Sequence, residues 1–384
     1  LLHSIIAEQY TRYYQQNRYI LLERPVLSGE NPKELERWSL IQLRDTIQSH
    51  YEASFPAFNA FDTIPLADYK LILSNTESQS IERIPTLFDL LTQRALSFYL
   101  NTDAGLNPPQ SAPEEIDQIG WLPAPDFALA RLPKNENHTI KALRLMQPLL
   151  RNNLSRNHYT AYVHNDLQRL QLVYELAGST TEAAKLYQQA LQSLINFLNG
   201  KPESTEATAA LAQLLIEQQQ NQPDTAFKGN NAKALELCEK AIKAYPESPG
   251  STRCKSIKAG ILQKHLQLSL DGVNLPNQVI PLQLTYKNIT NLYLKIIRIT
   301  SEELTRIRRQ NDLKSQITAL NLMPEVMRKS RNIPFESDYE QHQSIIDLPA
   351  LNTGLYVVLA SHHPDFNSES SVYADFQISR LSFI

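Results

Sequence analysis

Histidines come closest to metal-binding chemistry in this sequence. His362 and His363 stand just before Asp365, and His158 and His164 lie near the start of an expected helix. A metal site needs several ligands held in place by further hydrogen bonds. No further ligand is suggested near the first group, and helical geometry turns His158 and His164 roughly 120° apart. We interpret the first group as a solvated hairpin between strands and the second as solvated helix residues.

Two pairs of adjacent glutamates, Glu114-Glu115 and Glu302-Glu303, are the closest match to paired acid–base carboxylates. Adjacent side chains diverge in a helix or a strand, so neither spacing suits two carboxylates that act on one substrate. The sequence also has no GxGxxG, P-loop, GxSxG or HExxH motif. We therefore expect no catalytic, cofactor-binding or metal-binding residue, no cofactor, and no enzyme activity.

The chain has 2 cysteines, Cys238 and Cys254. They lack the CxxC spacing of a metal site, and three interpretations stay open. They are two small buried helix residues, or they form a disulfide between neighbouring helices in an oxidising compartment, or one is a reactive thiol.

The spacing of apolar residues changes near residue 265. This change indicates that helices position the residues before it and strands position those after it. Before it, apolar residues recur at helical spacing. The first three helices are expected at about 2–23, after Asn31-Pro32, and after Pro85. Residues 102–136 are proline-rich, and we expect this long loop to run over the helices, anchored by Trp121 and Phe127. Regular helices follow at about 138–152, 158–177, 181–199, 203–219, 231–245 and 251–264.

The segment 164–197 has the spacing of a helical hairpin. Gly178 is expected to end its first helix in a left-handed conformation. Small alanines such as Ala183 and Ala190 let the two helices approach, and Tyr187 fills the groove between them. This pattern resembles the tetratricopeptide repeat, as does the helix with Ala234, Cys238, Ala241 and Pro246. Such arrays commonly hold a partner or a neighbouring domain.

From Leu266 the apolar residues alternate, which is typical of strands. Strands are expected at about 266–270, 280–286, 292–300, 338–347, 354–361 and 372–383, with 292–300 central because it is apolar on both faces. This count favours an antiparallel two-sheet sandwich. The charged stretch 301–335 is interpreted as a solvated excursion with a short helix at 301–310, or alternatively as a basic docking patch.

Composition limits the class of protein. The 384 residues carry a net charge of −3, which argues against a nucleic-acid or anionic-membrane partner. No apolar run has the length of a membrane span. The chain begins with Leu1 instead of Met, so we expect a piece of a longer protein. We predict an N-terminal helical region with a long loop (1–136), helical hairpins (137–264) and a β-sandwich (265–384).

The sandwich resembles the first macroglobulin-like domain of bacterial α2-macroglobulin family proteins. The motifs that carry this resemblance are Leu282-Gln-Leu-Thr-Tyr-Lys-Asn288 before Leu292-Tyr-Leu-Lys295, Leu348-Pro349 before Gly354-Leu-Tyr-Val-Val-Leu-Ala-Ser361, and Phe376-Gln-Ile-Ser379. The helical region is similar to the long N-terminal region of one branch of the family, through Ile84-Pro-Thr-Leu-Phe-Asp-Leu-Leu91 and Arg94-Ala-Leu96.

The resemblance implies a non-catalytic N-terminal scaffold of an endopeptidase inhibitor of the bacterial cell envelope, periplasmic or extracellular. Family members that trap proteases covalently use a Cys-x-Glu-Gln thioester, which is absent here because Cys238 precedes Glu239-Lys240 and Cys254 precedes Lys255-Ser256. The implied partners are proteases, met through the full-length molecule, and downstream macroglobulin-like domains. Nucleic acid is not an expected partner, and a membrane is expected only through an anchor outside this chain.

Two other functions are alternatives to this interpretation. The first is a tetratricopeptide-like interaction module of an envelope complex, which predicts a concave helical groove. A groove filled by the loop at 102–136 would count against it. The second is an enzyme, such as an accessory piece of a glycosidase, which the missing paired carboxylates disfavour.

Overall fold

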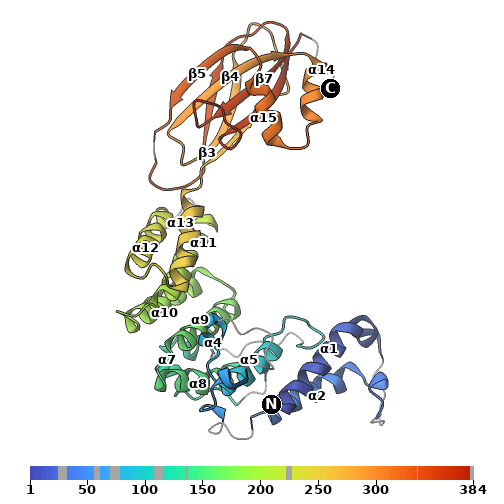
Figure 1. The fold of residues 1–384 in the computed structure, drawn as a ribbon, viewed down its shortest axis with the longest axis vertical. Coiled ribbons are helices and arrows are strands. Elements are labelled where there is room, and N and C mark those ends of the chain that lie inside the picture. Colours follow the sequence, from blue (N-terminus) through green and yellow to red (C-terminus); the bar gives the residue numbers. More distant parts are fainter. Residues whose placement is uncertain are drawn as a thin grey trace. The chain divides into compact units, whose positions relative to one another are not determined.

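The computed structural model shows a helical part followed by a sheet-forming part (Figure 1). It describes residues 1–24, 33–55, 61–69, 78–107, 116–134, 137–221, 227–334 and 336–380. Helix α13 ends at Leu262 and strand β1 begins at His265, so the predicted change near residue 265 is confirmed. The chain forms two compact units, 1–214 with 244–253, and 215–243 with 254–384. The predicted division into three domains stays a prediction.

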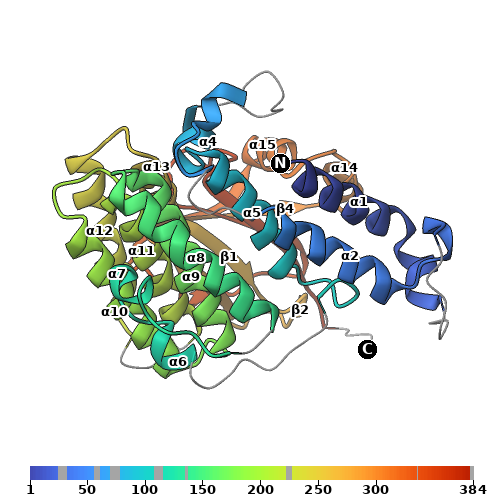
Figure 2. The ribbon, with the colours of Figure 1, turned by 90° about the horizontal axis from the view of Figure 1, so that it is seen from below.

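The first helices are α1 (Leu2–Glu23), α2 (Leu40–Ala53), α4 (Ser78–Arg83) and α5 (Leu87–Tyr99), with short 3-10 turns at Leu35–Arg37 and Leu66–Tyr69. Helix α2 begins at Leu40 because Ser39 and Gln42 form a capping box. The predicted start at Asn31 and Pro32 lies outside the described residues. Helix α5 follows Pro85 as predicted, capped by Thr86 and Asp89. Helices α1 and α2 lie side by side (Figure 2).

The later helices are α8 (His138–Ser155), α9 (Tyr159–Leu176), α10 (Thr181–Phe197), α11 (Ser204–Asn221), α12 (Asn230–Ala244) and α13 (Pro249–Leu262). All six confirm the predicted segments to within three residues. Helix α9 ends as predicted, because Gly178 has a φ of +71° just after it. No helix in the described part of the chain is both long and apolar enough to cross a bilayer.

The described part of the long loop that follows residue 115 is tied to the helices, as predicted, while residues 108–115 and 135–136 lie outside the described residues. It contains two short helices, α6 (Ile116–Ile119) and α7 (Ala124–Phe127). Phe127 is fully buried, and Trp121 is half-buried with its ring centroid 6.3 Å from that of Tyr187. Arg169 of α9 donates to the Gly120 carbonyl at 2.5 Å, so charge as well as apolar burial holds the loop.

The strands are β1 (His265–Ser269), β2 (Val273–Asn274), β3 (Ile280–Lys287), β4 (Asn291–Ile299), β5 (Glu325–Asn332), β6 (His342–Leu348), β7 (Gly354–Ser361) and β8 (Ser371–Ile378). They form a three-stranded sheet, β1-β3-β6, and a five-stranded sheet, β2-β8-β7-β4-β5. One core contains residues of both sheets, among them Leu282 of β3, Leu294 of β4 and Val358 of β7. Strand β4 lies inside the five-stranded sheet between β7 and β5, in agreement with the apolar residues on both of its faces, although β7 is the middle strand.

The structure corrects two details of this part. Strand β2 pairs with β8 in parallel, so the five-stranded sheet is mixed instead of fully antiparallel. The charged stretch 301–335 is no solvated excursion, because it contains α14 (Ser301–Arg308), α15 (Leu313–Asn321) and the edge strand β5. The predicted short helix at 301–310 is confirmed as α14.

Helices α14 and α15 cover the second face of the five-stranded sheet. Leu304 of α14 and Leu320 of α15 pack with Ile297 of β4 and Val357 of β7 in a separate apolar cluster. Strand β5 is exposed along most of its length, and it pairs with β4 along one side only. The central strands are therefore buried on both faces, which explains their continuous apolar sequence.

Candidate functional site

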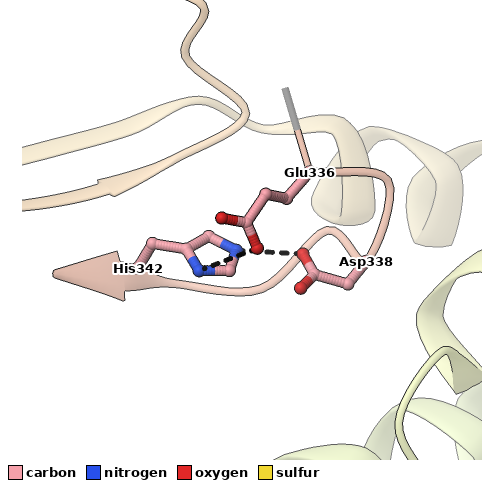
Figure 3. Close-up of side chains that lie close together, drawn as sticks. All are labelled: Glu336, Asp338 and His342. Atoms are coloured by element: carbon pink, nitrogen blue, oxygen red, sulfur yellow. Dashed lines mark hydrogen bonds and ion pairs between the residues drawn. The ribbon is translucent and has the colours of Figure 1, made fainter. Parts of the chain in front are cut away.

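A turn between β5 and β6, here called the 336–342 loop, gathers Glu336, Asp338 and His342 (Figure 3). The Asp338 side chain accepts the Glu340 N–H at 3.1 Å and so shapes the turn. Tyr339 adopts a φ of +57°, which brings the chain back toward β6. The three side chains therefore come from one short segment, and they point toward one another.

His342 lies between the two carboxylates. Its Nε2 is 3.0 Å from Asp338 Oδ1, and its Nδ1 is 3.4 Å from Glu336 Oε2. One ligand atom from each residue lies within 4.8 Å of the others. The Asp338 and His342 side chains are 12% and 22% exposed and Glu336 is 49% exposed, so the cluster opens to solvent on the Glu336 side.

The electrostatics of this loop favour an ionised Asp338. Burial works to raise the pKa of Asp338, but hydrogen bonds from the Glu340 N–H and from His342, together with the charge of Lys228, hold that pKa below its usual value. The ring of Tyr286 lies 5.7 Å from that of His342. Burial and then the negative charge of Glu336 raise the pKa of Tyr286, so its hydroxyl stays protonated at neutral pH.

One imidazole nitrogen and two carboxylate oxygens form a donor set that suits Zn²⁺ or Mn²⁺. The same atoms also satisfy one another as ion pairs, and acidic groups near a surface are common without a metal. Among the described residues no other group of three His, Cys, Asp or Glu side chains has suitable spacing. Sequence analysis missed this group because Glu336-x-Asp338-x-x-x-His342 spans a turn and a strand start, where no fixed periodicity relates the side chains.

Two helices hold the 336–342 loop. Gln219 of α11 donates to the Asp338 carbonyl at 3.5 Å and also contacts the Glu340 carboxylate. Asn231 of α12 donates from its side chain to the Tyr339 carbonyl at 3.3 Å, while its own N–H donates to Gln219 Oε1 at 2.7 Å. Gln219 is 1% exposed, so its side chain is shielded from water on the helix side of these contacts.

The turn between β3 and β4 holds the end of α13. Asn288 has a φ of +55°, and its side-chain amide donates to the carbonyls of Ile261 at 2.8 Å and Gln263 at 3.1 Å. Lys287 donates to the Gly260 carbonyl at 3.3 Å. The last carbonyls of a helix have no partner within it, and these side chains supply one. We call Gln219, Asn231, Lys287 and Asn288 the helix–sheet clamp.

The histidines and glutamates singled out in the sequence do not form one site in the described part of the chain. His363 Nδ1 lies 3.4 Å from Asp365 in the turn after β7, and the backbone N–H of His362 donates to the Ser370 carbonyl at 3.1 Å. His158 precedes α9 and His164 lies within it. Glu302 and Glu303 begin α14, where Glu303 completes a capping box with Thr300. Glu114 and Glu115 lie outside the described residues.

The structure agrees with the first interpretation of the cysteines, two buried helix residues, and it contains no disulfide between them. Cys238 of α12 and Cys254 of α13 are both fully buried, and their thiols share a hydrogen bond. This hydrogen bond and burial raise the pKa of the Cys238 thiol far above its usual value. The Cys238 thiol is therefore neutral at physiological pH while it stays reduced.

No protein-family model matches the chain, and no curated protein matches its sequence at a significant level. The function must therefore be argued from the fold and from the contacts described above.

Proposed function

We propose that this chain is the non-catalytic N-terminal scaffold of an α2-macroglobulin-like endopeptidase inhibitor of the bacterial cell envelope. In this proposal the two-sheet domain is of the macroglobulin-like type, and the hairpins from α8 onward are of the tetratricopeptide-like type. Proteases are met through the full-length molecule, and further macroglobulin-like domains follow downstream. The location is the periplasm or the outer surface of the cell.

The helix–sheet clamp is the observation that carries the proposal. The resemblance to the family includes the turn Tyr286-Lys-Asn288 between two strands, and this turn fastens the end of α13. Gln219 and Asn231 fasten a second loop of the same domain to α11 and α12. These side chains therefore join the sheet domain to the adjoining helix segments at two separate points, which suits a scaffold that bears other domains.

The long loop also supports a scaffold more than an open ligand groove. Its segment Trp121–Pro125 lines one cavity together with Arg169 of α9 and Leu194 of α10. The loop therefore covers the hairpin face formed by α9 and α10. A repeat array that binds a ligand usually leaves its concave face open.

The first test is the gene sequence on both sides of this chain. We expect an upstream signal sequence and a downstream series of sandwich domains with a protease-sensitive bait segment. A reading frame that encodes only this chain would contradict the proposal.

The second test uses the full gene product mixed with trypsin. A trapped protease loses activity on a large substrate such as casein but keeps activity on a small chromogenic peptide. Replacing Gln219 and Asn288 together by alanine should lower the trapped fraction. The control Asn291→Ala should not, because that exposed amide donates only to the neighbouring Thr290 hydroxyl, at 3.2 Å. Trapping would be contradicted if the unaltered protein lowered trypsin activity equally on casein and on the small peptide, or lowered neither activity.

An interaction module remains the second candidate, and one groove favours it. A cavity of about 440 Å³ lies among α9, α11 and the turn between α12 and α13, with Glu82, Glu203, Glu247 and Tyr245 on its walls. Such a surface suits a lysine-rich peptide. A fluorescence titration with that peptide should show salt-sensitive binding that Glu247→Lys weakens, and the absence of binding at low salt would reject this candidate.

A further inference from the structure

Two buried thiols face each other between α12 and α13, although the proposed scaffold function requires no cysteine. Cys238 and Cys254 each have 0% of their surface exposed. The thiols are hydrogen-bonded to each other, so their sulfur atoms are already neighbours. In the described part of the chain both cysteines are free of a disulfide.

A second contact joins the same two helices beside the thiols. Glu239 follows Cys238 on α12, and Lys258 lies four residues after Cys254 on α13. Their side chains form an ion pair at 2.7 Å. Residues four apart share a helix face, so Cys254 and Lys258 both look toward α12. The thiols and this ion pair therefore both lie where α12 and α13 pack against each other.

We propose that Cys238 and Cys254 are a site of oxidative modification at which a small disulfide, such as oxidised glutathione, converts the thiol pair into an intramolecular disulfide. The thiolate of one cysteine attacks a sulfur of the oxidant, whose S–S bond breaks and releases one glutathione thiolate. The other cysteine then attacks the mixed disulfide and releases the second glutathione. Two protein thiols are oxidised, one disulfide is reduced, and the two thiol protons end on two glutathione molecules.

The structure also sets when this reaction occurs. In the folded protein both thiols are shielded from water, and thiol–disulfide exchange requires an accessible thiolate. The first thiol therefore reacts with the oxidant while the chain folds, before α12 and α13 close over it. The closing helices then bring the second thiol to the mixed disulfide, and the fully folded pair reacts slowly. An oxidising envelope is a suitable compartment, but the chemistry itself does not depend on the proposed inhibitor function.

The disulfide should stabilise the helical pair because it closes a loop in the unfolded chain. Cys238 and Cys254 are 16 positions apart. A loop of that size lowers the equilibrium constant for unfolding on the order of 100-fold in the chain-entropy description. The stabilisation should disappear when a reductant such as dithiothreitol is added.

The experiment refolds the full chain from guanidinium chloride in glutathione redox buffer and, in parallel, with dithiothreitol. Intact mass and maleimide labelling of the denatured product count the free thiols. We expect the oxidised sample to lose two hydrogens, to take no maleimide, to keep its helical circular dichroism and to unfold at higher urea. The natively folded, reduced chain should react far more slowly with the same buffer.

Two serine variants serve as controls. Cys238→Ser and Cys254→Ser each retain one thiol, so each should end free or glutathionylated, and its stability should be the same in both buffers. The proposal is overturned if the refolded chain keeps two free thiols or carries glutathione or an intermolecular bond. It is also overturned if the disulfide costs helicity or stability. Protease trapping plays no part in these measurements, so their failure leaves the proposed function untouched.

Discussion

The buried ion pair of α9 should be the most sensitive electrostatic contact in the helical part. Asp166 and Arg169 have side chains only 2% and 1% exposed, with Arg169 Nη2 2.6 Å from Asp166 Oδ1. Arg169 also donates to the Gly120 carbonyl, and its guanidinium stands 4.6 Å from the centre of the Phe127 ring. We therefore choose Arg169→Leu, which keeps apolar contact with Phe127 and leaves the Asp166 carboxylate buried without a partner.

Removing one partner of a buried pair typically costs about 3–5 kcal/mol. For a unit of this size, that corresponds to a fall in Tm of roughly 10 °C. The matched control is Lys185→Leu, whose partner Glu182 has the same sequence spacing but whose pair is 60% and 73% exposed. Exposed pairs contribute at most about 1 kcal/mol, so this control should melt near the parent temperature.

The destabilisation should also depend on pH. Burial raises the pKa of Asp166 in the folded chain, and removing Arg169 raises it further. A raised folded-state pKa means that the folded state gains from protonation, so stability is lost as pH rises through that pKa. Between the folded-state pKa of the parent and that of Arg169→Leu, the gap in unfolding free energy should therefore widen by about 1.4 kcal/mol per pH unit.

Trp121 provides the assay because it belongs to the loop that Arg169 holds. With Trp38→Phe as the background, Trp121 is the one remaining tryptophan, so its fluorescence reports this region during urea and thermal unfolding. Adding Asp166→Leu to Arg169→Leu should recover part of the loss, since an apolar pair leaves no unpaired charge. An Arg169→Leu variant that melts like the parent, or whose loss is the same at pH 5 and pH 8, would refute this reasoning.

Three further outcomes are expected. Asn288→Ala should lower the free energy of unfolding by about 1–3 kcal/mol, because it removes two hydrogen bonds and places alanine at a φ of +55°. Asn288→Gly removes the same hydrogen bonds without the backbone strain, so it should lose less. Equal losses of the two variants in urea unfolding would show that φ is irrelevant. In α13, Gly250→Ala should destabilise the protein because the new Cβ would lie 2.2 Å from the backbone of α11. Gly260→Ala faces open space and should stabilise the protein by about 0.5–1 kcal/mol. Thermal melts that reverse this order would contradict the close approach of α13 to α11 at Gly250. Isothermal titration with Zn²⁺ at pH 7 should show one binding site in the parent protein. His342→Ala should abolish this binding and His363→Ala should leave it unchanged. A parent titration without binding heat would exclude a metal role for the 336–342 loop.

Long periodic segments could be predicted from the sequence because burial on one face leaves a regular trace. The regular helices and strands such as 280–286 and 354–361 are examples. Strand β5 could not be predicted in this way. Seven of its eight residues are exposed, so no apolar alternation marks it, and its pairing with β4 alone makes it a strand.

Contacts between distant residues were the least predictable part. The alternation of β8 gives no sign that β2 joins it in parallel, because that pairing involves only two residues of β2. The meeting of Cys238 with Cys254 depends on how two helices pack, and the sequence left it open. Glu336, Asp338 and His342 converge through a turn in which Tyr339 has positive φ, which its residue type does not predict.

The exposed edge strand also bears on self-association. A free sheet edge offers unpaired backbone groups to any other extended chain, and soluble proteins often protect such an edge with charge. Strand β5 carries Arg328, Lys329 and Arg331. If two copies met along this edge, their like charges would be forced together as the strands paired. This repulsion should oppose edge-to-edge association of the five-stranded sheets of two copies at high protein concentration.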